Sequence, residues 1–163
     1  MTTHPAACGQ SRTIHEAELD RNDVVALLDL HFAEMRADSP PEACHVLPLD
    51  GLRDPAIRFF SMRDGEGELL GVGALKTLDP HHGEIKSMRA NPSALGQGVG
   101  RDLLSHLVVE ARAAGFTRLS LETGNSELFA PARKLYESGG FTSCDPFGGY
   151  LPGPFTHFYS REI

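Results

Sequence analysis

The stretch Glu84-Ile-Lys-Ser-Met-Arg-Ala-Asn-Pro-Ser-Ala-Leu-Gly-Gln-Gly-Val-Gly-Arg-Asp-Leu-Leu104 decides how this chain folds. It reads as a strand, a turn, a glycine loop and the start of a helix. Ile85, Met88 and Ala90 are apolar residues among polar ones, a pattern that predicts extended structure. Pro92 has no N–H to give to a partner strand, so the strand should end just before it.

The glycine loop and the helix after it predict a site for an anion. Gly96, Gly98 and Gly100 alternate with other residues, which allows unusual backbone angles and brings N–H groups close to a ligand. Apolar residues recur at helical spacing from Val99, and Gly115 predicts the end of the helix. Free N–H groups and the positive end of the dipole meet at a helix start, so a phosphate is the expected ligand.

The type of phosphate site can be narrowed by the residues around the last glycine. A cation such as Arg101 in the first helical turn suggests a nearby anion, although a solvated surface arginine is the alternative. A P-loop needs Lys and then Ser or Thr after its last glycine, but Arg101 and Asp102 follow Gly100. A dinucleotide fingerprint needs a glycine where Arg101 stands, so that pattern matches poorly.

The composition limits the class of protein. The chain has 163 residues, 40% hydrophobic and 23% charged, so we expect one soluble domain with a substantial core. A net charge of −7, with no basic block, disfavours a nucleic-acid partner. Cys8, Cys44 and Cys144 are widely spaced and contain no C-x-x-C pair, which argues against disulfides or structural zinc and favours a reducing cytoplasm.

The N-terminal residues lack the apolar segment of a signal peptide, and no run is long enough to span a membrane. Residues 1–12 are therefore predicted to be a flexible tail, and residues 13–163 to form the domain. His81 and His82 are adjacent on a turn and point in different directions, so no metal site is predicted.

The elements before the quoted stretch follow from periodicity and turn residues. We expect a strand over 13–18 and then a helix, capped by Asp20 or Asn22, that ends at about Met35. The proline-rich segment 37–54 should be irregular or briefly helical. The runs 57–63 and 69–77 flank a glycine turn and predict a hairpin, to which the Glu84 strand adds a third antiparallel strand. Gly71 and Gly73 suggest a bulge or a close backbone approach.

The elements after the first helix of the quoted stretch complete a strand–helix–strand unit. Residues 118–123 predict a strand parallel to the Glu84 strand. Pro131 suits the first turn of a short helix, which Gly139 and Gly140 should end. Residues 156–162 alternate as a closing strand.

Two segments resemble the signatures of the GNAT superfamily, the acyl-CoA-dependent N-acyltransferases. The run Leu95-Gly96-Gln97-Gly98-Val99-Gly100 resembles the Gln/Arg-x-x-Gly-x-Gly/Ala loop that binds the acetyl-CoA diphosphate. The run Ala132-Arg-Lys-Leu135-Tyr136-Glu-Ser-Gly-Gly140-Phe141 resembles the second signature, Asn-x-x-Ala-x-x-Leu-Tyr followed by Gly-Phe. Leu95 and Phe129 stand where these signatures have Gln or Arg and Asn.

The resemblance implies one α/β domain of GNAT type, with a mixed, mostly antiparallel sheet and helices on both faces. It also implies acetyl-CoA as co-substrate, no metal, a small-molecule amine as acceptor and, as is common in that family, a homodimer. The residues that it implies for acetyl-CoA binding are Met88, Arg89, Ala90, Leu95, Gly96, Gln97, Gly98, Val99, Gly100, Arg101, Phe129, Ala132 and Tyr136.

Transfer of an acyl group from a thioester to an amine needs a base, donors for the oxyanion and an acid for the leaving thiolate. An alkylamine has a pKa of about 10.4, so a base must take its proton at neutral pH. Glu84 is the leading candidate, unless it is an exposed carboxylate at a strand end, and Glu122 on the neighbouring strand is the second. By the resemblance, backbone N–H groups over 88–90 hold the oxyanion and Tyr136 protonates the thiolate.

The acceptor amine cannot be identified from a pattern in the sequence. Arg36, Ser39, Glu42 and His45 are candidate acceptor ligands if the proline-rich segment lines the pocket, and solvated loop residues if it does not. His31 lies on an apolar helix stripe, where a core histidine is favoured over a catalytic one. Amino acids, polyamines and peptide termini all stay open as acceptors.

The sequence thus predicts an N-acetyltransferase that transfers the acetyl group of acetyl-CoA to a small primary amine by direct attack in a ternary complex. The alternative is a CoA-binding or sensing module without catalysis, because Leu95 and Phe129 depart from the signatures.

Overall fold

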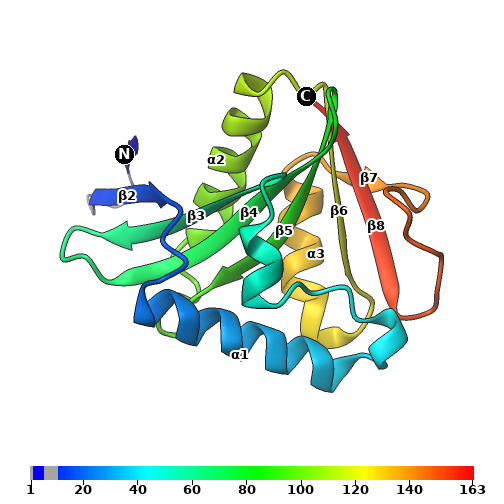
Figure 1. Cartoon of the computed structure of the whole chain (residues 1–163), viewed down its shortest axis with the longest axis horizontal. Helices are drawn as coiled ribbons and strands as arrows, with labels where there is room; N and C mark the ends of the chain where they lie inside the picture. The colour runs from blue at the N-terminus through cyan, green and yellow to red at the C-terminus, as the bar shows by residue number, and fades with distance from the viewer. Residues whose placement is uncertain (1, 6–10) are drawn as a thin grey trace.

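A computed structural model describes residues 2–5 and 11–163, with side chains from residue 11 onward (Figure 1). It contains three α-helices, α1 (Asn22–Asp38), α2 (Val99–Ala113) and α3 (Ala130–Ser138). The described strands are β1 (Thr2–Pro5), β2 (Ser11–Glu16), β3 (Ile57–Asp64), β4 (Leu69–Asp79), β5 (His82–Ala90), β6 (Arg118–Gly124), β7 (Thr142–Ser143) and β8 (Thr156–Glu162). Short 3-10 turns are η1 (Pro41–Ala43), η2 (Leu49–Arg53), η3 (Pro92–Ala94) and η4 (Glu127–Phe129).

The strands form one sheet in the order β1-β2-β3-β4-β5-β6-β8-β7. Among the described strands, only β5 and β6 pair in parallel, and the other neighbours pair antiparallel. The predicted hairpin, the third antiparallel strand and the parallel crossover are therefore confirmed. The predicted mixed, mostly antiparallel sheet is confirmed as well.

Each face of the sheet carries its own apolar core. On one face, Leu103 and Leu107 of α2 pack with residues of α3 and with inward residues of the sheet such as Leu121. On the other face, α1 packs through Val24, Leu27 and Leu28, together with residues of η2 and β4. Figure 1 shows α1 and α2 on opposite sides of the sheet. The predicted helices on both faces follow from these two amphipathic stripes.

The expectation of a flexible tail over residues 1–12 is wrong where the structure describes it. Thr2–Pro5 form β1, which pairs with β2, and β2 begins at Ser11, two residues before the predicted strand. Residues 1 and 6–10 lie outside the described part of the chain. The sequence of β2 carries the missed signal, because Arg12 alternates with apolar Ile14 on the strand and its side chain is buried.

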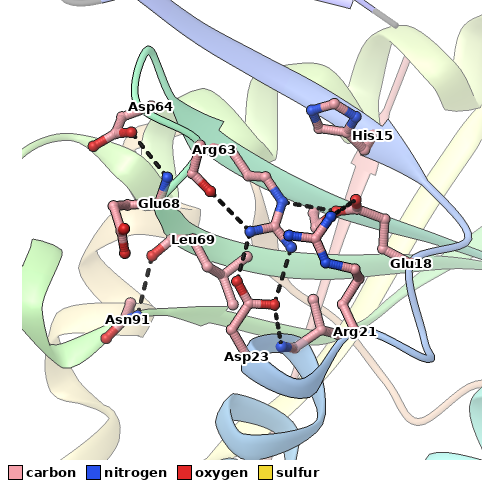
Figure 2. A network of polar contacts seen from close by, with 12 residues as sticks. His15, Glu18, Arg21, Asp23, Arg63, Asp64, Glu68, Leu69 and Asn91 are labelled. Carbon is pink, nitrogen blue, oxygen red and sulfur yellow. Dashed lines mark hydrogen bonds and ion pairs between the residues drawn. The ribbon is translucent and has the colours of Figure 1, made fainter.

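A buried arginine fixes the start of α1 to the sheet (Figure 2). Arg63 on β3 is 3% exposed, and it donates hydrogen bonds to both oxygens of Asp23, at 2.6 and 3.0 Å, and to Glu18 at 3.0 Å. A buried guanidinium is tolerated only when its charge is paired in this way. The Arg63 hydrogen bond also lowers the pKa of Asp23. This cluster holds α1 against the face of the sheet that carries the site described below.

The strands β5 and β6 separate along their length, and this separation creates the site. They pair only from His82 with Arg118 to Ile85 with Leu121. Beyond that point the two strands diverge, as Figure 1 shows. The remaining part of β5, residues 86–90, keeps its pairing with β4 on one side and has an open side toward β6.

A bulge in this part of β5 changes which side chains face which side of the sheet. Val72 pairs with Arg89 and Ala74 with Lys86, so one residue of β4 faces two residues of β5. Ser87, inside the bulge, has a positive φ of 52°. Because of the extra residue, Met88 and Ala90 pack on the α2 side, whereas the Arg89 side chain reaches α1.

Candidate active site

A cavity of about 200 Å³ lies where β5 and β6 diverge. Its walls come from α1, from the irregular segment 39–47, from residues 84–89 of β5, from residues 122–124 of β6, and from η4 and α3. Because the strands are apart here, the cavity connects the α1 face of the sheet with Tyr136 on the α3 face. Two reactants could therefore meet in it from opposite faces.

Three polar side chains form a connected group on the α1 face of the cavity. Tyr150 donates a hydrogen bond to Glu84 Oε2 at 2.6 Å, and Lys86 Nζ donates to the Tyr150 hydroxyl at 2.7 Å. Lys86 Nζ also lies 3.2 Å from Glu84 Oε2. Glu84 is 2% exposed, so it is not the exposed strand-end carboxylate that the sequence left open. Burial is the main reason that the pKa of Tyr150 is raised, with the Glu84 charge second.

Glu122 is the second carboxylate of the cavity, and its surroundings differ from those of Glu84. It lies on β6, one residue beyond the last pair with β5, and it lines the cavity. No hydrogen bond joins its carboxylate to another described residue. Burial raises the pKa of Glu122 to about 7, while the charge of Lys86 lowers it and that of Glu84 raises it. Glu122 therefore changes protonation state near neutral pH.

Tyr136 closes the cavity from the other face of the sheet. Its ring packs on Phe141 and Tyr159 in the α2 and α3 core, and the residue is 6% exposed. Burial first, and the charge of Glu122 second, raise the pKa of the Tyr136 phenol. The phenol therefore stays protonated at neutral pH, and no hydrogen bond joins its hydroxyl to another residue that the structure describes. A protonated hydroxyl in the cavity wall can give its proton to a ligand.

The glycine loop has the geometry that the sequence predicted. Gly96 and Gly98 have positive φ angles of 77° and 76°, and Gly98 is the N-cap of α2 without any side-chain hydrogen bond at the cap. The N–H groups of the first turn of α2 are therefore available to an anion. Gly100 allows α3 to approach, because a Cβ there would lie 2.9 Å from Leu135 Cδ2.

Two side chains hold this loop in place from both of its ends. The Asn91 side chain donates to Leu69 O of β4 at 3.0 Å and accepts from Ser93 N. At the other end, the buried Arg12 donates to Gln97 O and to Asp102 Oδ2, each at 2.6 Å. Arg12 reaches the loop from β2, which lies next to the edge strand β1 and three strands away from β5 in the sheet. Residues 12 and 102 are 90 positions apart, and no local pattern pairs them.

The residues predicted to bind acetyl-CoA fall into three groups in the structure. Met88, Arg89, Phe129, Ala132 and Tyr136 line the cavity. The loop residues 95–100 and Arg101 lie at the start of α2, outside the cavity lining, where the Leu95 side chain is exposed. Ala90 packs against the core under α2. These residues lie on β5, in the loop after it, in the first turn of α2, and in η4 and α3, so an elongated ligand would be needed to reach all of them.

The predicted acceptor residues are only partly brought together. Ser39 and His45 line the cavity, and the His45 ring packs edge-on against Tyr150 at 4.9 Å. Arg36 and Glu42 do not line it, and the Arg36 guanidinium lies over the Phe32 ring of its own helix. The segment 39–47 is thus a pocket wall, as one of the two alternatives predicted.

Sequence reasoning missed Lys86 and Tyr150 as site residues. Lys86 could have been found, because it lies two residues from Glu84 and the alternation of a strand places both side chains on one face. Tyr150 lies in the Gly/Pro-rich loop between β7 and β8, which has no repeating pattern. Gly148 and Gly149, both with positive φ, are the one local signal that this loop turns sharply before Tyr150.

Within residues 2–5 and 11–163, no group of three or more His, Cys, Asp or Glu side chains is placed to hold a metal ion. The two described cysteines, Cys44 and Cys144, are free, and Cys8 lies outside the described residues. None of the described helices is both long enough and apolar enough to cross a bilayer.

Comparisons with known proteins agree with this geometry. The family model "Acetyltransferase (GNAT) family" matches residues 22–141. The chain is 48% identical to "Uncharacterized N-acetyltransferase YsnE" of Bacillus subtilis over 90% of this chain and 96% of that protein. It is 42% identical to "Uncharacterized N-acetyltransferase YedL" of Escherichia coli over 93% of this chain and 94% of that protein.

A solved structure of a GNAT family acetyltransferase from Elizabethkingia anophelis with acetyl-CoA bound has the same fold. The TM-score is 0.69 and the identity 21%, over 93% of this chain and 98% of that one. The expectation of an acyltransferase, made from the two sequence signatures, is confirmed by the family match and by the names of the relatives. From its sequence and its fold, the chain belongs to the GNAT family of acetyltransferases.

Proposed function

We propose that this protein is an N-acetyltransferase that transfers the acetyl group of acetyl-CoA to a small primary amine. The observation that carries the proposal is the opening between β5 and β6, which joins the side of the glycine loop to a cavity with two carboxylates and a buried phenol. In this arrangement the thioester enters on the α2 side and the amine on the α1 side. Direct attack in a ternary complex follows from such an opening.

The loop and β5 fit acetyl-CoA by their donors. The first N–H groups of α2, after Gly96 and Gly98 in left-handed conformation, suit a diphosphate. The open side of β5 over 86–90 offers backbone groups that a pantetheine amide could pair with, as a strand would. The same N–H groups over 88–90 would stabilise the oxyanion of the tetrahedral intermediate. Arg101, at the start of α2 with a largely exposed side chain, would add charge to the diphosphate site.

Glu122 suits the general base better than Glu84, which the sequence favoured. Glu84 Oε2 already accepts hydrogen bonds from Tyr150 and Lys86, so this oxygen is occupied by partners within the protein. Glu122 lacks such a partner among the described residues, and its pKa of about 7 matches the working pH. We therefore assign the proton transfer to Glu122, and we assign to Glu84, with Lys86 and Tyr150, the shaping of the acceptor side.

Starting from the neutral form of the amine, the reaction then needs two proton transfers. The amine nitrogen attacks the thioester carbonyl carbon and forms the C–N bond, and the proton that it loses passes to the Glu122 carboxylate. When the C–S bond breaks, the thiolate takes the proton of the Tyr136 hydroxyl. A thiol has a pKa of about 8.5 and a phenol one of about 10 in water, so the transfer is uphill by about 1.5 units, and burial of Tyr136, which raises the phenol pKa, adds to this. The products are the N-acetylated amine and CoA.

Release of free thiol from acetyl-CoA over a panel of primary amines tests the proposal. We expect amine-dependent thiol release, and calorimetric binding of acetyl-CoA without any amine. The Glu122→Gln and Tyr136→Phe proteins should bind acetyl-CoA as the unchanged protein does and release thiol more slowly. Binding of acetyl-CoA without thiol release for any amine would instead favour the alternative, a CoA-binding module.

A further inference from the structure

The α1 end of the cavity carries a cation that none of the catalytic steps above uses. The Arg89 side chain lines the cavity, and its Nη1 donates to Glu34 Oε2 of α1 at 2.5 Å. No hydrogen bond joins its Nε or Nη2 to another described residue. A guanidinium has five N–H donors in a planar fork, so this single contact leaves most of the fork available to a ligand.

The bulge at Ser87 aims Arg89 at the acceptor side. Met88 and Ala90 pack toward α2, where the glycine loop begins, whereas Arg89 points to α1 on the opposite face. The diphosphate site is at the start of α2, on the other face from this side chain. Arg89 is therefore placed to contact the acceptor rather than the phosphates of acetyl-CoA.

His31 stands beside Arg89 as a second unused polar group. It lies on α1 one turn before Glu34, it lines the cavity, and it is 9% exposed. Its Nδ1 is fully buried without a hydrogen-bond partner among the described residues. Burial first, and the Arg89 charge second, lower the pKa of His31 to about 4, so the imidazole is neutral. A buried polar atom without a partner is costly, and a ligand could satisfy it.

Charge is therefore distributed unevenly along the cavity. Glu122 lies on β6 near Tyr136, where the amine reacts, and the charges of Glu84 and Lys86 act on Glu122 from β5. Arg89 and the neutral His31 lie at the α1 end. A polyamine would bring a further ammonium group toward Arg89, and the two like charges would repel each other. An acceptor with an amine at one end and an anion at the other matches both ends.

We propose that the acceptor is an amine that carries a carboxylate, and that Arg89, with His31 beside it, binds this carboxylate at the α1 end of the cavity. The inference rests on the proposed acetyltransferase function and narrows its acceptor class. Arg89 here is a specificity-determining residue, because a planar guanidinium fork matches a carboxylate in charge and shape.

The test compares matched acceptors on the whole protein. For each of L-alanine, L-methionine, L-glutamate, β-alanine and γ-aminobutyrate, thiol release is measured beside that of its carboxamide (the α-amide for glutamate), with spermidine as the polyamine. We expect kcat/KM for the acids to exceed that for the matched carboxamides by about 10- to 100-fold, the range for one charge-assisted contact. This comparison needs no variant and so does not depend on folding.

Variants then assign the preference to Arg89. Arg89→Gln should raise KM for the acid about 10- to 100-fold, keep kcat within a few-fold, and leave the carboxamide nearly unchanged. Arg89→Lys, which keeps the charge without the fork, should recover part of the loss. The matched control is Arg53→Gln, since Arg53 also pairs with one carboxylate, Asp20 at 2.7 Å, but lies outside the cavity lining. KM for acetyl-CoA should not change in any of them.

The outcomes distinguish a failure of the carboxylate inference from a failure of the proposed acetyltransferase function. If carboxamides or spermidine react as well as the acids, or if Arg89→Gln affects acid and carboxamide equally, the carboxylate inference is overturned while the acetyltransferase stands. A rise in KM for acetyl-CoA alone would assign Arg89 to the co-substrate and likewise overturn it. Absence of thiol release with every acceptor would overturn the proposed function itself, and the inference with it.

Discussion

Replacement of Glu122 by Gln tests the central electrostatic feature of the site. Glu122 has an ordinary pKa of 4.5 in the unfolded chain and one of about 7 in the fold, where burial disfavours its charge. Between these two values the folded protein holds a proton that the unfolded chain has lost, so stability falls as the pH rises. A difference of about 2.5 units at about 1.36 kcal/mol per unit gives a loss of about 3 kcal/mol above pH 7. Partial exposure makes this an upper value.

Glutamine has nearly the same shape and cannot ionise, so Glu122→Gln removes this loss. We expect the variant to gain stability relative to the unchanged protein at pH 8 by up to about 3 kcal/mol more than at pH 4.5. Urea unfolding at both pH values, without acetyl-CoA, measures the difference. If the gain is the same at the two pH values within about 0.5 kcal/mol, Glu122 titrates like an exposed carboxyl and the reasoning fails.

The same substitution has a kinetic counterpart. With Glu122 as base, kcat/KM should rise with pH through about 7, because the carboxylate form is the active one. Glu122→Gln should remove this limb and lower the rate on the order of 10²-fold. A rate that loses its limb in Glu84→Gln instead would return the role of base to Glu84.

Four further substitutions test other parts of the site. Tyr136→Phe should keep the affinity for acetyl-CoA and lower turnover by about tenfold or more, and unchanged turnover in single-turnover kinetics would remove its role as acid. Tyr150→Phe removes the hydroxyl between Lys86 and Glu84, so urea unfolding should show a loss of about 1 kcal/mol in stability. Steady-state kinetics should show a higher KM for the acceptor. If stability and KM both match those of the unchanged protein, the Tyr150 hydroxyl is dispensable. Arg12→Gln loses the contacts to Gln97 O and Asp102, so calorimetry should show weaker binding of acetyl-CoA. The control Arg53→Gln should bind acetyl-CoA as the unchanged protein does. Equal affinities of the two variants would mean that the loop holds its shape without Arg12. The pKa of His31 lies at about 4, below its ordinary value of 6.5, so the folded protein loses stability as the pH falls from 6.5 to 4. His31→Gln should flatten this pH dependence of stability in urea unfolding. An unchanged dependence would contradict a buried neutral imidazole.

Much of the fold could be predicted because its elements are locally encoded. The hairpin of β3 and β4 follows from alternation around a glycine turn, and α2 from an apolar stripe that begins at a glycine loop and ends at Gly115. The start of β2 was missed because its burial depends on contacts distant in sequence. Arg12 is polar and would be exposed on most strands, but Asp102 and Gln97 O allow it to be buried.

The site itself was predictable only in part, for a similar reason. Glu84, Glu122 and Tyr136 could be named because they lie on elements with clear patterns or on a family signature. Which carboxylate is paired could not be predicted, since the partner Tyr150 comes from a loop 66 residues away. The pKa of Glu122 depends on burial between separated strands, and that separation has no signature in the sequence.

The additional residue at Ser87 has a consequence for how this protein could change its acceptor. It places Lys86 and Arg89, three positions apart, on the same α1 face of the sheet, while Met88 and Ala90 pack toward α2. Under the proposed function, the first pair faces the amine and the second pair faces the thioester. Mutations at Lys86 and Arg89 could therefore change the acceptor without changing the residues that contact acetyl-CoA.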